Sequence, residues 1–193
     1  MSKGFPILAS VLPLAGAVPA GLAQTSQNAQ HKELLGTLEN GVYHHTLTGI
    51  EFTLAADWVI VSEAPASQQD AEVVNLKNSS STGMATVWLK RRNADRADIP
   101  ALMSGRLDAK VVQRNNFQGY KFRPESVQHT TIGGRPALSA IADYVGAGQK
   151  MVEYVTWVDG ERSRVVFVGR MPVSDLADFQ TRFEPVIRSV IVP

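Results

Sequence analysis

The sequence contains no cysteine and only four histidines. The absence of cysteine excludes disulfide bonds, thiol catalysis and thiolate metal sites, so packing alone must hold the fold together. Neither a His-Glu-x-x-His zinc motif nor a Gly-x-Ser-x-Gly nucleophile elbow occurs. His44 and His45 are neighbours that would point to opposite faces of a strand, which argues against one shared metal ion. The sequence therefore predicts no catalytic residues, no metal site and no cofactor.

Long apolar runs are also scarce, and the N-terminus holds the most informative one. Residues 4–23 are apolar but broken by proline and glycine, and Lys3 is the only charge before residue 24. Such a run is too short and too broken to span a bilayer as a helix, whereas a cationic start and a small-residue end are typical of a signal peptide. We expect a signal peptide over residues 1–23, cleaved after Ala23 or Ala20, the alternative being an uncleaved anchor or a disordered tail. The mature protein would then be periplasmic or extracellular, and not transmembrane.

The charges that remain are balanced in total but uneven along the chain. Without Lys3 the chain has 18 basic and 18 acidic residues, yet residues 90–123 carry nine basic and three acidic ones. A neutral total argues against a dedicated nucleic-acid binder, while a basic segment can meet an anionic surface. The expected partner is an acidic envelope protein or an anionic surface, and the alternative is a solvated loop. The candidate patch consists of Lys90, Arg91, Arg92, Arg96, Arg106 and Lys110.

The hydrophobic pattern predicts a polar linker over residues 24–40 and one domain over residues 41–193. Alternating or short apolar runs predict strands over residues 42–47, 50–54, 58–61, 72–77, 84–90, 138–144, 151–158 and 164–170. Helical spacing predicts one helix over residues 99–113 and another from Ser174 onward, which Pro185 should bend or interrupt. In the first helix a basic stripe is expected on a solvated face, formed by Arg106, Lys110 and Arg114. The predicted fold class is α+β, with an antiparallel sheet of about seven strands flanked by two main helices.

Three local patterns resemble those of the PsbP-like α/β/α sandwich family. They are a Gly-Ile-Glu-Phe-x-Leu strand followed by a tryptophan (residues 49–58), a Gly-Gly-Arg-Pro-Ala turn (133–137) and a Phe-x-x-x-Phe-x-x-x-Ile-x-x-Ser-Val ending (179–190). The resemblance covers residues 41–193. Similar domains occur as photosystem extrinsic subunits, as small secreted bacterial proteins and as appendages of zinc peptidases, so it implies a fold rather than an activity.

Three functional hypotheses remain. The favoured one is a secreted or periplasmic non-catalytic binding or accessory protein. The alternative is a carrier of a small apolar ligand in a cavity between sheet and helices, lined by Met84, Trp88, Met151, Trp157 and Phe167. The third is an enzyme with an unmarked site, such as a dispersed set of Ser139, His129 and Asp143, which no signature spacing supports.

Overall fold

The computed structural model describes residues 35–66, 71–91 and 99–193. Its first elements form a three-stranded antiparallel sheet of β1 (Gly36–Glu39), β2 (Val42–His45) and β3 (Glu51–Thr53). Asn40 and Gly41 join β1 to β2 with φ values of 51° and 79°, the geometry of a two-residue hairpin turn. The predicted linker over residues 24–40 is therefore wrong at its end, because β1 lies inside it. The predicted signal peptide and its cleavage sites lie outside the described residues.

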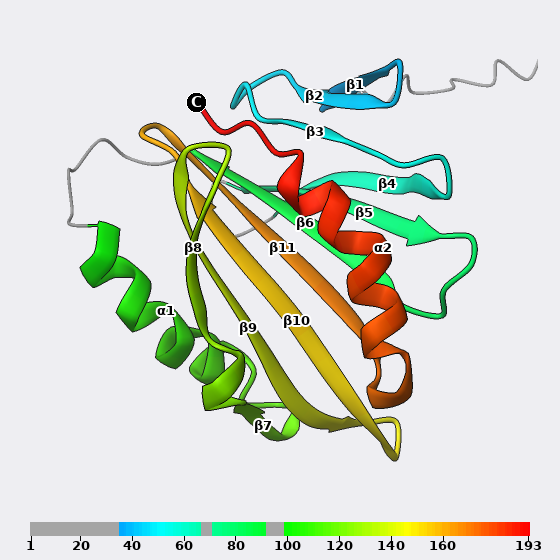
Figure 1. The fold of residues 1–193 in the computed structure, drawn as a ribbon, viewed down its shortest axis with the longest axis vertical. Coiled ribbons are helices and arrows are strands. Elements are labelled where there is room, and N and C mark those ends of the chain that lie inside the picture. The colour runs from blue at the N-terminus through cyan, green and yellow to red at the C-terminus, as the bar shows by residue number, and fades with distance from the viewer. Residues whose placement is uncertain (1–34, 67–70, 92–98) are drawn as a thin grey trace, which may run out of the picture. The chain divides into compact units, whose positions relative to one another are not determined.

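A larger antiparallel sheet of eight strands forms the centre of the domain (Figure 1). Its strands run in the order β4-β5-β6-β11-β10-β9-β7, and β8 pairs with β9 as well. Their bounds are β4 (Trp58–Ala66), β5 (Ala71–Asn78), β6 (Met84–Arg91), β7 (Gln118–Phe122), β8 (Gln128–Ile132), β9 (Arg135–Gly146), β10 (Gln149–Asp159) and β11 (Ser163–Pro172). The predicted α+β class with an antiparallel sheet is confirmed. Strands β7 and β8 were outside the predicted set because their apolar signal is short: only Tyr120 and Phe122 of β7 and Ile132 of β8 are buried or half-buried.

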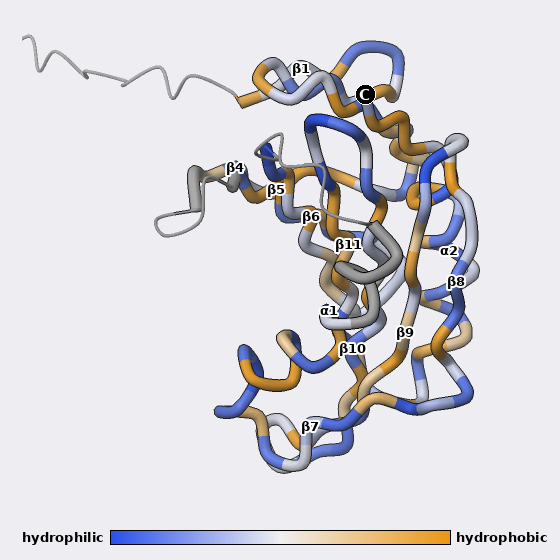
Figure 2. The backbone as a smooth tube through the Cα atoms, turned by 90° about the vertical axis from the view of Figure 1, so that its left-hand side faces the viewer, coloured by the Kyte–Doolittle hydropathy of each residue, from blue (hydrophilic) through white to orange (hydrophobic). Residues whose placement is uncertain are grey.

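Two main helices cover opposite faces of this sheet (Figure 2). Helix α1 (Ile99–Gln113) lies on one face and α2 (Leu176–Arg188) on the other, and two short 3-10 helices, η1 (Pro124–Ser126) and η2 (Val173–Asp175), complete the chain. The main core lies under α2, where Phe179 and Phe183 pack against Phe167 of β11. Pro185 does not interrupt α2, which continues to Arg188. No helix in the described part of the chain is long and apolar enough to span a membrane.

The pleat of β10 divides its side chains between the two faces of the sheet. Val152, Tyr154 and Val158 join the core on the α2 side. Residues at the odd positions point to the α1 side, where Val155 and Trp157 belong to a second, smaller apolar cluster. The same odd positions carry the carboxylates Glu153 and Asp159, both with no side-chain exposure. A buried carboxylate needs cationic partners, and the α1 side of the sheet supplies them.

Candidate anion-binding site

Glu153 is the centre of a buried ionic cluster between α1 and the sheet. Arg170 on the neighbouring strand donates from Nε to Glu153 Oε2 over 2.8 Å, and Arg114 donates from Nε to the same oxygen over 3.2 Å. Lys110 Nζ lies 3.2 Å from Glu153 Oε1, and the Tyr120 hydroxyl donates to that oxygen over 2.9 Å. Burial opposes ionisation of Glu153, but the three cations outweigh it and lower the pKa of the carboxyl group. Glu153 is therefore an anion that holds three cations in place.

Asp159 forms a second cluster of the same kind at the end of β10. Arg106 of α1 lies 2.5 Å from Asp159, from Nη1 to Oδ2, and Arg164 of β11 donates from Nε to Oδ1 over 2.7 Å. Burial opposes ionisation here too, yet the hydrogen bonds from both arginines lower the pKa of Asp159. The two carboxylates thus fix α1 to the sheet through charged contacts, and Leu107 of α1 adds an apolar contact with the smaller cluster.

These contacts reverse the predicted orientation of α1. The basic stripe expected on a solvated face points inward, since Arg106 and Lys110 are each 8% exposed. Val112 is instead 72% exposed, and Val111 is also exposed. The prediction is wrong because it assumed that a sheet face offers only apolar surface, whereas this face presents two carboxylates that need cations. The burial of the stripe follows from Glu153 and Asp159, which no helical periodicity can reveal.

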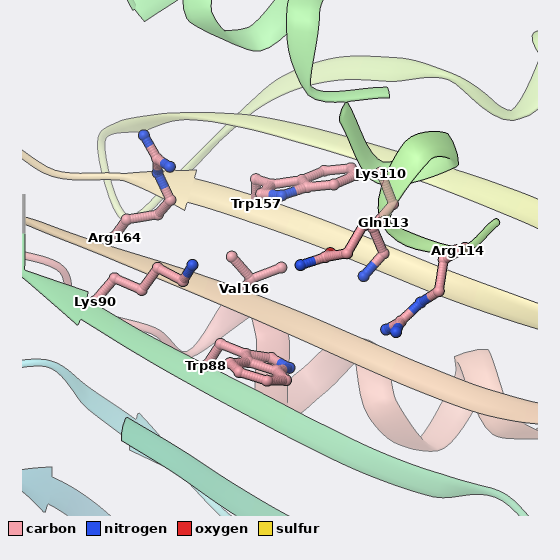
Figure 3. Close-up of a pocket in the computed structure, with 8 residues that line it drawn as sticks. All are labelled: Trp88, Lys90, Lys110, Gln113, Arg114, Trp157, Arg164 and Val166. Atoms are coloured by element: carbon pink, nitrogen blue, oxygen red, sulfur yellow. The ribbon is translucent and has the colours of Figure 1, made fainter. Parts of the chain in front are cut away.

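A pocket lies between α1 and the sheet and has a volume of about 130 Å³ (Figure 3). It is lined by Trp88, Lys90, Lys110, Gln113, Arg114, Trp157, Arg164 and Val166. Strand register explains its floor, because Val166 pairs with Trp157 on one side and with Trp88 on the other. The next pairs along the same strands bring Lys90 beside Arg164, and Arg164 beside Asp159. The sheet beneath the pocket therefore has two rows of side chains that run across the strands. One row consists of Trp88, Val166 and Trp157, and the neighbouring row consists of Lys90, Arg164 and Asp159.

Among the described residues, positive charge exceeds negative charge around this pocket. Four of the described residues that line it are cations and none of them is a carboxylate. With the two clusters behind the lining included, the described part of the chain places six cations around two carboxylates, namely Lys90, Arg106, Lys110, Arg114, Arg164 and Arg170 around Glu153 and Asp159. Burial lowers the pKa of Lys110 to about 8 against the opposing charge of Glu153, and burial together with the Arg164 charge lowers the pKa of Lys90. Crowded, partly desolvated cations of this kind are stabilised by an anion.

Comparison with known proteins identifies the fold. No protein-family model matches the sequence, and no curated protein matches it. The solution structure of cyanobacterial PsbP (CyanoP) from Synechocystis sp. PCC 6803 is similar with a TM-score of 0.61 at 10% identity, over 79% of this chain and 91% of that chain. The chain has the PsbP-like fold.

The PsbP-like fold is also that of LpqN, whose crystal structure is described as that of a protein involved in cell envelope biogenesis of Mycobacterium tuberculosis. That structure has a TM-score of 0.55 at 13% identity and covers 75% of this chain and 83% of LpqN. Identities this low establish the fold alone, so the chemistry of this PsbP-like domain must come from its own residues.

In this PsbP-like domain the members of the predicted basic patch do not lie together. Lys90 and Lys110 line the pocket, and Arg106 lies behind it against Asp159. Arg91 is exposed next to Lys90 on β6, so its side chain points to the opposite face of the sheet. Arg92 and Arg96 lie outside the described residues. The pocket adds two cations from outside the predicted patch, of which Arg114 had a signal in its four-residue spacing from Lys110, whereas Arg164 had none.

The five residues expected to line an apolar cavity do not do so together. Phe167 belongs to the core under α2, while Trp88 and Trp157 face the pocket on the α1 side. Met151 packs against a separate aromatic cluster, and Met84 is 56% exposed. The predicted single cavity is therefore wrong, because alternation sends Phe167 to the other face of the sheet, while Met84 and Met151 lie several residues along their strands from Trp88 and Trp157.

Ser139, His129 and Asp143, the dispersed catalytic set considered above, make no hydrogen bonds with one another in the described part of the chain. Ser139 is buried and shares a 2.9 Å hydrogen bond with Thr156, and Asp143 accepts two hydrogen bonds from Arg123. His129 is exposed on β8. Over residues 35–66, 71–91 and 99–193, no group of three or more His, Asp or Glu side chains is placed to hold a metal ion.

Proposed function

We propose that this PsbP-like domain is a non-catalytic binding protein of the cell envelope that holds an anionic group in the pocket between α1 and the sheet. One observation carries the proposal: of the residues that the structure describes, four cations and no carboxylate line the pocket. The carboxylates that position three of these cations, Glu153 and Asp159, are buried behind the lining.

Preorganisation supports binding at this place rather than at a solvated loop. Lys110 and Arg114 are held by Glu153, and Arg164 is held by Asp159, so these long side chains have lost much of their rotamer freedom in the folded protein. An incoming anion meets donors that are already ordered, which lowers the entropic cost of binding. Exposed lysines and arginines would have to be ordered at the moment of binding.

The envelope location rests on separate support. The N-terminal residues have the pattern of a secretory signal peptide, and LpqN, which shares the fold, is described as involved in envelope biogenesis. The non-catalytic character is supported by the lack of a catalytic motif in the sequence and by the structural partners of Ser139 and Asp143. A purely apolar ligand is not favoured, because four of the described residues that line the pocket on the α1 side are cations.

Titration calorimetry with inorganic phosphate tests the proposal. We expect the unmodified protein to bind phosphate with an affinity that falls as salt is added, and Lys90→Met to weaken binding about tenfold by removing one charge-assisted contact. Lys77→Met is the matched control, because Lys77 is an exposed lysine on β5 that does not line the pocket. Absence of phosphate binding, or equal weakening by both variants, would contradict the proposal.

A further inference from the structure

The size of the pocket limits what it can hold. Pockets that bind drug-sized molecules have volumes of roughly 300–1,000 Å³, and a cavity of roughly 150 Å³ accommodates one benzene molecule. The volume here is about 130 Å³. The pocket therefore has room for a single six-membered ring and not for a peptide segment or a larger fused system.

The floor of the pocket offers flat apolar faces for such a ring. Figure 3 shows the indoles of Trp157 and Trp88 on either side of Val166, as their pairing in the sheet requires. A valine between two much larger side chains leaves a slot above it. In an ordinary core the facing helix would fill this slot with apolar side chains, but α1 presents Lys110, Gln113 and Arg114 there. The slot thus combines aromatic sides with a polar roof.

One end of the slot carries two cations, Lys90 and Arg164. Figure 3 shows the Lys90 ammonium group extending toward Val166, with Arg164 beside Trp157. Arg164 pairs with Asp159 through Nε, and within the described residues its terminal nitrogens have no partner. A guanidinium fixed at Nε presents two further N–H donors that match a phosphate or carboxylate.

We infer that the pocket binds a small molecule with one six-membered ring that carries a phosphate or carboxylate group. The ring lies over Val166 between Trp88 and Trp157, and the anionic group binds Lys90 and Arg164. The inference rests on the proposed function, since it names the class of ligand for that same pocket. Aromatic rings and sugar rings share the flat carbon face that stacks on indole, so the test separates these two sources.

The experiment is calorimetry on the mature protein with phenyl phosphate, glucose 6-phosphate, methyl phosphate and benzyl alcohol. We expect at least one ring phosphate to bind about tenfold or more tightly than methyl phosphate, because stacking on an aromatic side chain contributes on that scale. Tighter binding of phenyl phosphate identifies an aromatic ligand, and tighter binding of glucose 6-phosphate identifies a sugar ligand. Benzyl alcohol, which lacks the charge, should bind weakly.

A tryptophan variant tests whether the ring advantage comes from the slot. Trp88→Leu should remove the difference between ring phosphates and methyl phosphate while methyl phosphate still binds, which also shows that the variant is folded. Met84→Leu is the control, since Met84 lies on the same face of β6 outside the pocket lining. Equal binding of all three phosphates would overturn the ring inference and leave the proposed function standing. Binding of none of them would overturn both.

Discussion

Arg170 lies directly opposite Glu153 in the antiparallel pairing of β10 with β11, and its Nε donates to Glu153 Oε2 over 2.8 Å. Lys110 and Arg114 reach the same carboxylate from α1. One buried anion therefore joins two strands and a helix. Among the described residues, Arg106, Lys110 and Arg114 attach α1 to buried carboxylates of the sheet, whereas Phe179 and Phe183 attach α2 to the main core.

Removing the charge of Glu153 should be costly. Glu153→Gln keeps the shape of the side chain but leaves three cations without their carboxylate, and breaking a buried ion pair from one side costs about 3–5 kcal/mol. We expect a loss of that size in the free energy of unfolding, measured by urea denaturation. The control is Asp178→Asn, which breaks the exposed pair with Arg182 and should cost less than about 1 kcal/mol. Similar small losses for both variants would contradict the role given to Glu153.

The orientation of α1 can be tested with two substitutions close together on one helix. Lys110→Glu places a second carboxylate against Glu153 and should destabilise the protein by several kcal/mol, as expected for uncompensated buried charge. Val112→Glu alters an exposed position and should change the free energy of unfolding by less than about 0.5 kcal/mol. A larger loss of stability for Val112→Glu than for Lys110→Glu would mean that the basic stripe faces solvent.

The sequence predicts local features such as turns and single strands well, but it does not predict which distant segments pair with one another. The Asn40-Gly41 turn is a local signal, and it locates the β1–β2 hairpin once it is recognised. The apolar run of residues 151–158 predicts β10 but gives no sign that Glu153 within it is buried. That Glu153 is buried depends on Arg170 seventeen residues later and on α1 before it. The pocket likewise requires the register that places Trp88 and Trp157 on either side of Val166.

Lys110 should make stability depend on pH above neutrality. Burial lowers its pKa to about 8 in the folded protein, while an unfolded lysine titrates near 10.4. Between about pH 8 and pH 10 the unfolded chain binds more protons at this site than the folded chain, so stability rises with pH. The free energy of unfolding of the unmodified protein, minus that of Lys110→Met, should therefore increase from pH 7.5 to pH 9.5. A constant difference would show that Lys110 is not desolvated.

An anion in the pocket should raise the pKa of Lys110 and so take up protons when it binds near pH 8. Calorimetry with sulfate, a dianion that does not titrate between pH 6 and pH 8, measures this uptake directly when it is carried out at pH 8 in two buffers that differ in ionisation enthalpy. We expect a fractional uptake near pH 8 that disappears at pH 6, where Lys110 is already protonated. Equal heats in both buffers at pH 8 would place the anion away from Lys110.

Two glycines should respond in opposite directions to alanine. A Cβ added at Gly169 would lie 2.3 Å from Cε1 of the buried Phe179, so Gly169→Ala should destabilise the protein by about 1–3 kcal/mol through overpacking. Gly105 is exposed in α1 with no heavy atom within 4 Å of the added Cβ. Gly105→Ala should stabilise the protein by about 1 kcal/mol through helix propensity. Thermal or urea unfolding distinguishes the two, and destabilisation by both would contradict the helical assignment around Gly105.

The most direct test of the account is a titration of the mature protein with phenyl phosphate, followed by nitrogen-15 NMR of the tryptophan indole N–H groups. The chain has three tryptophans, of which Trp88 and Trp157 line the pocket and Trp58 packs against Phe183 on the other side of the sheet. The account predicts that the signals of Trp88 and Trp157 shift together and saturate, while that of Trp58 stays in place. Three unmoved signals, or a shift of Trp58 as large as the others, would contradict it.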